Sequence, residues 1–332
     1  MAQIEDIDDA LEAVPAREAG PVVIGIDVGG TSVKMGVVTQ RGEIIAQTKV
    51  PTGALEGAEA LGRVSNAAVG LAKGAGIEAS AVAGIGLDVP GVVLEDGTLA
   101  MAPNITLDLD GLREALAQAF PSARIATIND ANAAALGETW VGAGAGADSL
   151  VMLTLGTGVG GGVVIGGRVI AGVHGAAGEI GHLCMNFEET EACGCGRRGC
   201  LEQYASARGL IRLYREECAT CGAAEVEIAH ATDALAVFEA ARGGNAQAKR
   251  ACERLGTILA RALAALAVTV DPDAFVLGGG MCGGWDTFGQ TCVDAYREFV
   301  IPGCAETPIR VATLGNAAGL LGAARHALAA LQ

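Results

Sequence analysis

The apolar positions of this chain follow a pattern of strand, turn and strand that occurs twice. From Pro21, short apolar runs separated by glycine-containing turns predict a three-stranded meander over residues 22–27, 33–38 and 43–50. A second series of strand, glycine turn, strand, small turn and strand begins at Ser149 and ends near Gly172. Two copies of one arrangement in a single chain predict two related domains.

Helical stretches follow each meander, over residues 58–73 and 206–217. Other short apolar runs predict strands at 82–89, 124–128, 274–278 and 309–313. This alternation is typical of an α/β fold with mixed sheets. We expect the last helix, from about Ala317 to Leu331, to cross back onto the first domain.

The acidic balance of the chain excludes one large class of partner. The formal net charge is −16, whereas nucleic-acid phosphates are bound by Lys and Arg, so we expect no nucleic-acid partner. Residues 1–19 contribute to this acidity and carry Ile4, Ile7, Leu11 and Val14 at helical spacing. They fit either a short amphipathic helix lying on the body or a frayed tail.

Neither export nor membrane insertion is expected from the sequence. The first residues lack the basic start and apolar core of a secretion signal. The longest uncharged run, Ser149 to Gly167, contains seven glycines, so it fits a β-hairpin better than a spanning helix. Ten cysteines without an export signal are typical of reduced thiols, which predicts a cytoplasmic protein without a membrane partner.

A cluster of metal-binding residue types lies in the cysteine segment, which we define as residues 179–202. Cys193, Cys195 and Cys200 form a CxCxxxxC pattern, and His182 lies eleven residues before its first member. Three thiolates and one imidazole are the ligand set of a closed tetrahedral zinc site, which leaves no position for a catalytic water. Unpaired buried cysteines are the alternative. A structural zinc here would also fix two flanking acceptors, Glu179 and Glu202, for a ligand that bears several hydroxyl groups.

Two glycine turns are candidates for binding phosphate. We call VGGTS, residues 28–32, the first glycine turn and GTGVG, residues 156–160, the second. The second resembles the dinucleotide fingerprint GxGxxG, but that motif requires a following helix and here a strand pattern follows. No GxxxxGK[ST] loop occurs. Turns of this kind expose successive N–H groups and hydroxyls toward phosphate oxygens, and a purely structural hairpin is the alternative for either turn alone.

A polar pair follows the apolar strand that ends near residue 128. Asn129 and Asp130 open an alanine-rich helical stretch. Asp130 fits a helix cap, since aspartate is favoured there, and it equally fits a ligand-binding carboxylate at the end of a strand in an α/β fold. The sequence leaves both interpretations open.

Several motifs together resemble the repressor, open reading frame, kinase (ROK) family of sugar kinases, and most closely its bacterial glucokinases. They are DVGGTSVK, PGVV, APN, NDANAAALGE, GTGVGGG, GAAGEIGH, CGCGRRGCLE and VLGGGM, in this order from Asp27 to Met281. The resemblance implies a two-domain, actin-like, hexokinase-type fold with its active site in the interdomain cleft. On this basis we expect an acidic segment over 1–20, a small domain over 21–130 plus 315–332, and a large domain over 131–314 that holds the zinc-binding segment.

The resemblance also implies roles for individual residues. Asp130 matches the general base that takes the proton from the sugar 6-hydroxyl. The matching sugar-contacting positions are Gly91, Asn104, Asn129, Asp130, Glu179, His182 and Glu202. The matching ATP-binding positions are Asp27, Gly29, Gly30, Thr31 and Lys34, then Thr154, Gly156, Thr157 and Gly158, and finally Gly278, Gly279 and Gly280, with Asp27 near magnesium. ATP and Mg²⁺ at the nucleotide, a structural Zn²⁺ on His182, Cys193, Cys195 and Cys200, a hexose acceptor and a homodimer complete the expectation.

The identity of the sugar is left open. After Asn104 the chain runs ITLDLDG and lacks a tryptophan that is frequent near this point in the glucokinases. Glucose, mannose, fructose, N-acetylglucosamine and N-acetylmannosamine are therefore candidate acceptors, and polyphosphate is an alternative donor. A sugar-binding regulatory protein without catalysis is the alternative of another class. The DNA-binding repressors of the family are excluded by the short acidic N-terminus, which has no room for a helix-turn-helix domain.

Overall fold

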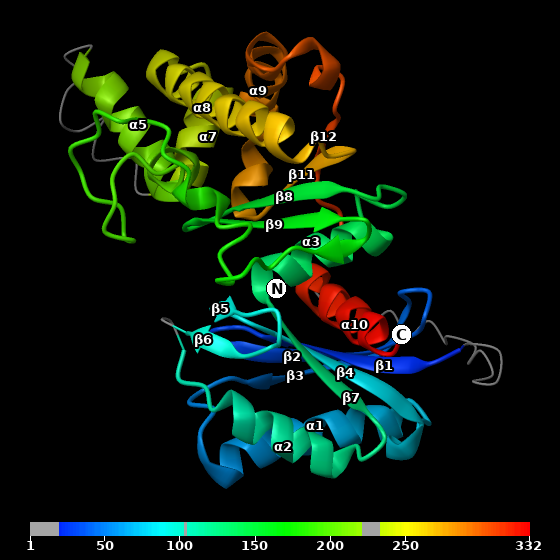
Figure 1. Cartoon of the computed structure of the whole chain (residues 1–332). Helices are drawn as coiled ribbons and strands as arrows, with labels where there is room; N and C mark the ends of the chain where they lie inside the picture. The colour runs from blue at the N-terminus through cyan, green and yellow to red at the C-terminus, as the bar shows by residue number, and fades with distance from the viewer. Residues whose placement is uncertain (1–19, 103–104, 221–232) are drawn as a thin grey trace, which may run out of the picture.

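Two five-stranded mixed sheets carry the fold in the computed structural model, which describes residues 20–102, 105–220 and 233–332 (Figure 1). The first sheet has the order β3-β2-β1-β4-β7 and the second has the order β10-β9-β8-β11-β12. The predicted α/β class with mixed sheets is confirmed. The predictions for residues 1–19 and for Asn104 fall outside the described residues.

Both predicted meanders are present, because β1–β2–β3 and β8–β9–β10 each pair antiparallel with their chain neighbours. The first sheet consists of β1 (Val22–Val28), β2 (Ser32–Val38), β3 (Ile44–Pro51), β4 (Val82–Val89) and β7 (Arg124–Asn129). The second consists of β8 (Leu150–Leu155), β9 (Val159–Ile165), β10 (Arg168–Val169), β11 (Ala274–Gly278) and β12 (Ile309–Val311). A small hairpin joins β5 (Val92–Val93) to β6 (Leu99–Met101).

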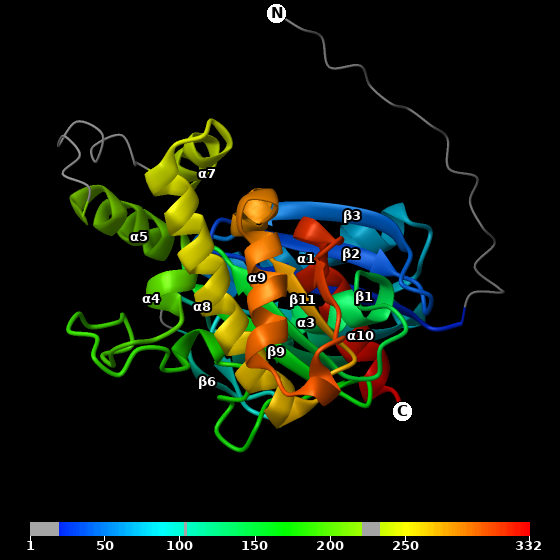
Figure 2. The same ribbon diagram turned by 90° about the horizontal axis from the view of Figure 1, so that it is seen from above.

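Helices cover both faces of each sheet. Helices α1 (Gly57–Gly74) and α2 (Leu109–Ala119) pack on the outer face of the first sheet, in one buried cluster that includes Ile24, Leu61 and Leu112. Helices α4 (Glu202–Ala205), α5 (Ala207–Thr220), α7 (Ala234–Arg242), α8 (Ala246–Val270) and α9 (Trp285–Phe299) belong to the cluster on the outer face of the second. Figure 2 shows α8 and α9 side by side over that sheet.

Two further helices lie between the sheets, and glycine and alanine set how closely they approach (Figure 1). Helix α10 (Ala318–Ala330) crosses back onto the first sheet, as predicted, and also packs on α3 (Asp130–Val141). A Cβ at Gly25 or at Gly86 would overlap the backbone of α10, and a Cβ at Gly322 would overlap that of α3. The helix backbones therefore lie directly on strand and helix backbone, which explains why a chain with 50 glycines and few aromatic residues packs densely.

The strand directions bring distant polar residues to one edge of each sheet. Strands β1, β4 and β7 are parallel, and so are β8, β11 and β12. In an open α/β sheet, ligands bind beyond the carboxyl ends of such strands. Those ends carry Asp27, Asp88 and Asn129 in the first sheet, and Thr154 and Gly278 in the second.

The apolar run from Ser149 to Gly167 forms the hairpin β8–β9, as predicted, and not a helix. Among the described helices, none combines the length and the apolar content that a membrane crossing requires. The cysteines in the described part of the chain are free thiols.

Candidate functional site

Asp130 lies at the end of β7, as the first residue of α3. Its Oδ1 accepts hydrogen bonds from the Ala131 amide (2.8 Å) and from Asn129 Nδ2 (3.0 Å). The side chain is accessible to solvent, yet partial desolvation raises its pKa, and the charge of Asp27 raises it further. A carboxylate whose pKa is raised in this way is a better proton acceptor than an ordinary aspartate.

The cap of α3 is Asn129, and the alternative that Asp130 caps this helix is therefore wrong. Asn129 has extended backbone angles, and its Oδ1 accepts a hydrogen bond from the Asn132 amide at 3.0 Å. Its Nδ2 donates to the Gly91 carbonyl at 2.8 Å. Because Asn129 meets the Asn132 amide, the Asp130 carboxylate, whose Oδ1 accepts from the Ala131 amide and from Asn129, is not needed as the helix cap.

Gly91, another predicted sugar-contacting position, lies close to this asparagine for a steric reason. Its φ is 140°, and a Cβ there would overlap the Met101 carbonyl in the neighbouring strand β6. Only glycine therefore allows this turn to approach β6 and to present its carbonyl to Asn129.

Asp88 is a buried acid that the sequence analysis did not identify. It is fully buried, and neither of its carboxylate oxygens has a hydrogen-bond partner. Desolvation raises its pKa well above the ordinary aspartate value, and the charges of Asp27 and Asp130 add to this shift. The available signal was a single charged residue inside the apolar run VAGIGLDV.

Asp27 has a cation on one side and this buried acid on the other. Lys34 Nζ lies 2.9 Å from Asp27 Oδ2, and Lys34 is also the antiparallel partner of Asp27 in the strand pairing. The Cβ position of Gly319, in the first turn of α10, lies 2.9 Å from Asp88 Oδ2 and 3.5 Å from Asp27 Cγ. The start of this helix therefore covers both acids, and a larger residue there would displace them.

The first glycine turn connects β1 to β2 at this edge. The Gly29 amide donates to the Ser32 carbonyl at 3.1 Å, and Thr52 Oγ1 donates to the Gly29 carbonyl at 2.6 Å. The Thr52 amide also donates to the Thr31 carbonyl at 3.1 Å. A Cβ at Gly30 would meet nothing within 4 Å, so this part of the turn is open to a ligand.

The second glycine turn connects β8 to β9 and is held from both sides. The Gly156 amide donates to the Gly158 carbonyl at 2.9 Å, and the Gly156 carbonyl accepts from the Ala207 amide at 2.8 Å. Thr157 is at the tip of the turn and lines a groove with Glu202, Ser206 and Arg208. As predicted, β9 and not a helix follows this turn.

Gly278, Gly279 and Gly280 form the turn at the end of β11, beside the second glycine turn. Gly279 has a φ of 88°, and a Cβ there would overlap the Leu155 carbonyl at the end of β8. A short 3₁₀ helix, Gly280–Gly284, follows and leads into α9. These three glycines therefore form a sharp turn between a strand and a helix.

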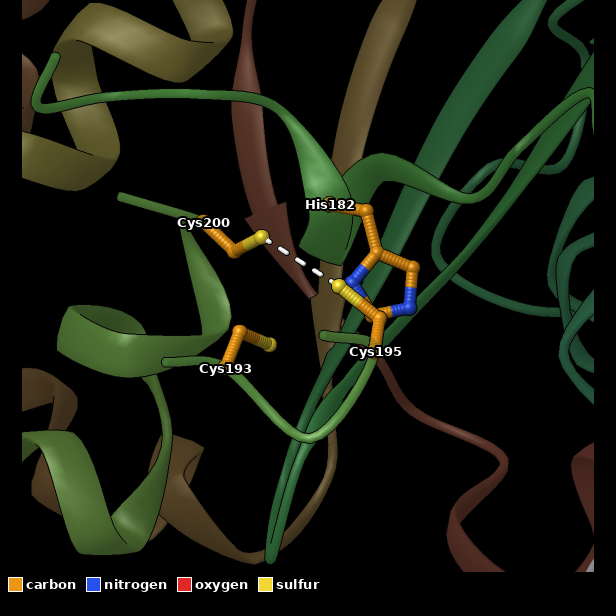
Figure 3. A group of neighbouring side chains, drawn as sticks. All are labelled: His182, Cys193, Cys195 and Cys200. Atoms are coloured by element: carbon orange, nitrogen blue, oxygen red, sulfur yellow. Dashed lines mark hydrogen bonds between the residues drawn. The ribbon is translucent and has the colours of Figure 1, made fainter. Parts of the chain in front are cut away.

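The structure brings the four predicted zinc ligands together (Figure 3). The candidate ligand atoms of His182, Cys193, Cys195 and Cys200 all lie within 4.8 Å of one another. A tight loop over residues 193–197 brings the cysteines together. The Cys193 amide donates to the Arg197 carbonyl at 2.7 Å, and the Gly196 amide donates to the Cys193 carbonyl at 2.9 Å. His182 enters from a separate 3₁₀ turn, Ile180–His182.

The pKa values of the thiols in this cluster are shifted in different directions. Burial raises the pKa of Cys200 to about 12, with the neighbouring thiols adding to the shift. Burial also raises the pKa of Cys193, whereas a backbone hydrogen bond from Arg197 lowers that of Cys195. Cys193 and Cys200 therefore resist losing their protons unless a cation compensates the charge. The donor set and its spacing therefore fit zinc.

A second network, absent from the sequence analysis, ties the cysteine segment to α4 and α5. Glu189 is buried, and its carboxylate accepts from Tyr204 Oη (2.6 Å) and from Arg212 Nη2 (2.5 Å). It also accepts from the amides of Thr190 and Glu191. Although burial acts in the opposite direction, these bonds lower the pKa of Glu189 to about 2. Glu189 is thus held as a carboxylate that anchors the loop.

Of the predicted sugar-contacting residues in this segment, Glu179 and His182 are neighbours. Glu179 Oε2 lies 3.9 Å from His182 Nε2, and both side chains are partly exposed. Glu202 has a different surrounding, because its carboxylate lies against the second glycine turn and near Cys193. Glu202 therefore has contacts of its own, different from those between Glu179 and His182.

Comparison with known proteins gives concordant matches over almost the whole chain. The sequence model described as ROK family matches residues 23–330. A glucokinase of Halalkalibacterium halodurans is 37% identical over 308 residues, covering 90% of this chain and 92% of that protein. An N-acetylmannosamine kinase of Escherichia fergusonii is 35% identical over 309 residues, covering 91% and 96%.

Solved structures agree with these matches. A ROK hexokinase from Thermus thermophilus superposes with a TM-score of 0.78 at 34% identity, covering 93% of this chain and 99% of that chain. A ROK family glucokinase from Streptomyces griseus, solved in complex with glucose and AMPPNP, superposes with a TM-score of 0.69 at 34% identity, covering 91% and 98%. The two-sheet architecture is thus the actin-like fold of the ROK hexokinases.

Proposed function

Because the chain belongs to the ROK family, we propose that it is an ATP-dependent hexose kinase that transfers the γ-phosphoryl group to the sugar 6-hydroxyl. Glucose is our first candidate acceptor. The observation that best supports this is the Asp130 carboxylate, which lies at the carboxyl edge of the first sheet and has a raised pKa. The similarity to a glucokinase solved with glucose and AMPPNP supports the same substrate pair.

In this proposal each group of site residues has one role in phosphoryl transfer. Asp130 takes the proton from the 6-hydroxyl as its oxygen attacks the γ-phosphorus. The new phosphorus–oxygen bond forms as the bond from the γ-phosphorus to the bridging oxygen breaks, so that ADP leaves and the sugar 6-phosphate is the product. The amides of the two glycine turns hold the phosphates, and Asp27 would hold the Mg²⁺ ion, which would disperse the phosphate charge when bound. Gly91, Asn129, Glu179, His182 and Glu202 contact the sugar, and Gly278–Gly280 contact the adenosine side.

We assign the cysteine cluster to a structural zinc ion, with His182, Cys193, Cys195 and Cys200 as its ligands. The support is the donor set itself, whose four candidate ligand atoms lie within 4.8 Å of one another. Zinc bound by one imidazole nitrogen would fix the ring so that the other nitrogen faces the sugar. The zinc ion would then orient His182, while Asp130 accepts the proton.

The domain division, location and assembly remain proposals. We divide the chain into a small domain, 21–130 plus 315–332, and a large domain, 131–314, because each sheet has a separate outer core. A reduced compartment such as the cytoplasm suits the free thiols of the described residues. A homodimer is the assembly that we expect, and size-exclusion chromatography with light scattering measures it.

Sugar-dependent release of ADP tests the kinase proposal. Purified protein with ATP and Mg²⁺ should release ADP only when a hexose is supplied, and a panel of glucose, mannose, fructose and N-acetylhexosamines should rank glucose first. The N-acetylmannosamine kinase relative makes that amino sugar the main competitor. Polyphosphate replaces ATP in a parallel assay. Sugar binding in calorimetry without any ADP release would instead support a binding protein.

A further inference from the structure

The Glu202 side chain makes a contact that sugar binding does not require. Its Oε2 accepts a hydrogen bond from the Val159 amide at 3.0 Å, although 43 residues separate the two positions. Its Oε1 lies 3.7 Å from Cys193 Sγ. Glu202 therefore lies between the cysteine cluster and the second glycine turn.

Glycine at position 158 is what allows this contact. A Cβ at Gly158 would overlap Glu202 Oε2, so any larger residue would push the carboxylate away from the Val159 amide. Close by, the Ala207 amide donates to the Gly156 carbonyl at 2.8 Å. Residues that follow the last cysteine thus hold the second glycine turn at both of its ends.

We infer that Glu202 is a positioning residue for the second glycine turn and fixes the direction of the amides that receive the nucleotide phosphates. The inference rests on the proposed kinase function. A carboxylate that accepts a backbone N–H removes freedom from a glycine-rich turn, and this freedom would otherwise be lost when phosphate binds. The second oxygen of Glu202, Oε1, lies 3.7 Å from Cys193 Sγ, and a carboxylate oxygen can accept more than one hydrogen bond, so a sugar contact and the turn contact are compatible.

The affinity for nucleotide in the absence of sugar separates this role from a sugar contact alone. We expect Glu202→Ala to weaken the binding of a non-hydrolysable ATP analogue with Mg²⁺ about tenfold, because a charge-assisted bond to the turn is lost. Glu202→Gln should stay within about twofold of the wild type, because its amide oxygen can accept the same N–H. Unchanged sugar-free affinity in Glu202→Ala would overturn the inference.

Gly158→Ala gives a second test in which residue 202 is not itself replaced. The added methyl should displace the carboxylate and weaken analogue binding in the wild-type background, but much less in the Glu202→Ala background. Such non-additivity in a double-mutant cycle is the expected result. Fully additive effects would contradict the inference. Gly62→Ala, in helix α1 with nothing within 4 Å of the new Cβ, controls for glycine replacement in general.

The two proposals fail in different ways. If the wild-type protein releases ADP with hexose while Glu202→Ala keeps full analogue affinity, only the positioning role is wrong. If the wild-type protein neither binds the analogue nor releases ADP, the kinase function and the positioning role are both wrong. Calorimetry with the analogue, run beside the coupled assay, provides both readouts.

Discussion

Asp27 and Asp88 are direct partners on the parallel strands β1 and β4, and the charge of Asp27 is one cause of the raised pKa of Asp88. Asp27 forms an ion pair with Lys34, whose Nζ lies 2.9 Å from it, whereas the charge of Lys34 is only the smallest of the causes that act on the pKa of Asp88. Asp88 is fully buried with neither oxygen paired, so the protonated form is favoured. The ion pair with Lys34 is therefore made by Asp27, whereas burial favours the protonated form of its strand partner Asp88.

Replacing Asp88 by Asn should stabilise the protein at neutral pH. An Asp whose pKa is raised by folding contributes full stability below its unfolded pKa of about 3.9, and the stability falls as pH rises toward the folded pKa. The asparagine amide does not titrate, so its contribution to the free energy of unfolding does not fall as pH rises. The free energy of unfolding of Asp88→Asn should therefore exceed that of the wild type by more at pH 8 than at pH 5. Urea unfolding at both pH values measures this.

Asp96→Asn is the matched control for this measurement. Backbone hydrogen bonding by Thr98 lowers the pKa of Asp96, so its stabilising effect exists at neutral pH and declines on acidification. The control should therefore show no gain in stability at pH 8. If Asp88→Asn lowers the free energy of unfolding by the same amount at every pH, the raised pKa of Asp88 is contradicted.

Asp130→Asn should lower kcat by about 10²- to 10⁴-fold, the usual contribution of a positioned base, while sugar affinity changes little. Steady-state kinetics and calorimetry with the sugar measure the two effects. Because desolvation raises the pKa of Asp130, the acid limb of kcat/KM should lie above the ordinary aspartate value of about 3.9. Asp110→Asn, on the exposed start of α2, should behave as the wild type. Retained turnover in Asp130→Asn would remove its assignment as the base.

Zinc should be present at about one equivalent per chain by elemental analysis, as expected for one closed four-ligand site. Cys200→Ser should lose the metal, and with it sugar affinity. Acidification should release zinc from the wild type, because a thiol with a metal-free pKa of about 12 must be deprotonated to bind. Cys184→Ser, an exposed cysteine outside the cluster, should keep its zinc. A zinc-free protein with full activity would show that the metal has no such role.

Glu189→Gln should loosen the cysteine segment. The change replaces a buried carboxylate that accepts from Tyr204 and Arg212, and charge-assisted bonds of this kind contribute about 1.5–3 kcal/mol. We expect a lower melting temperature and weaker zinc binding in competition with a chelator. Glu188→Gln, at the exposed neighbouring position, should leave both unchanged. Equal zinc affinity in the two variants would mean that the network stabilises the fold without preparing the metal site.

Features that depend on near neighbours were predictable from the sequence. The convergence of Cys193, Cys195 and Cys200 follows from their spacing and from the glycines between them, and the β8–β9 hairpin follows from a turn flanked by apolar runs. The start of α3 was also predictable, but its cap was not, because Asn129 and Asp130 are both good cap residues. Backbone angles and side-chain direction decided between them.

What the sequence determined by itself is the α/β class, the two meanders and the residue types of the site, since these depend on local periodicity and spacing. Only the tertiary structure brought Asp88 beside Asp27, Glu202 to the Val159 amide and Glu189 to Arg212. Each of these contacts joins segments from different strands, turns or helices, and strand order and helix packing are decided by the burial of whole surfaces. A buried charge or a bridging carboxylate is therefore recognisable only when its surroundings are known.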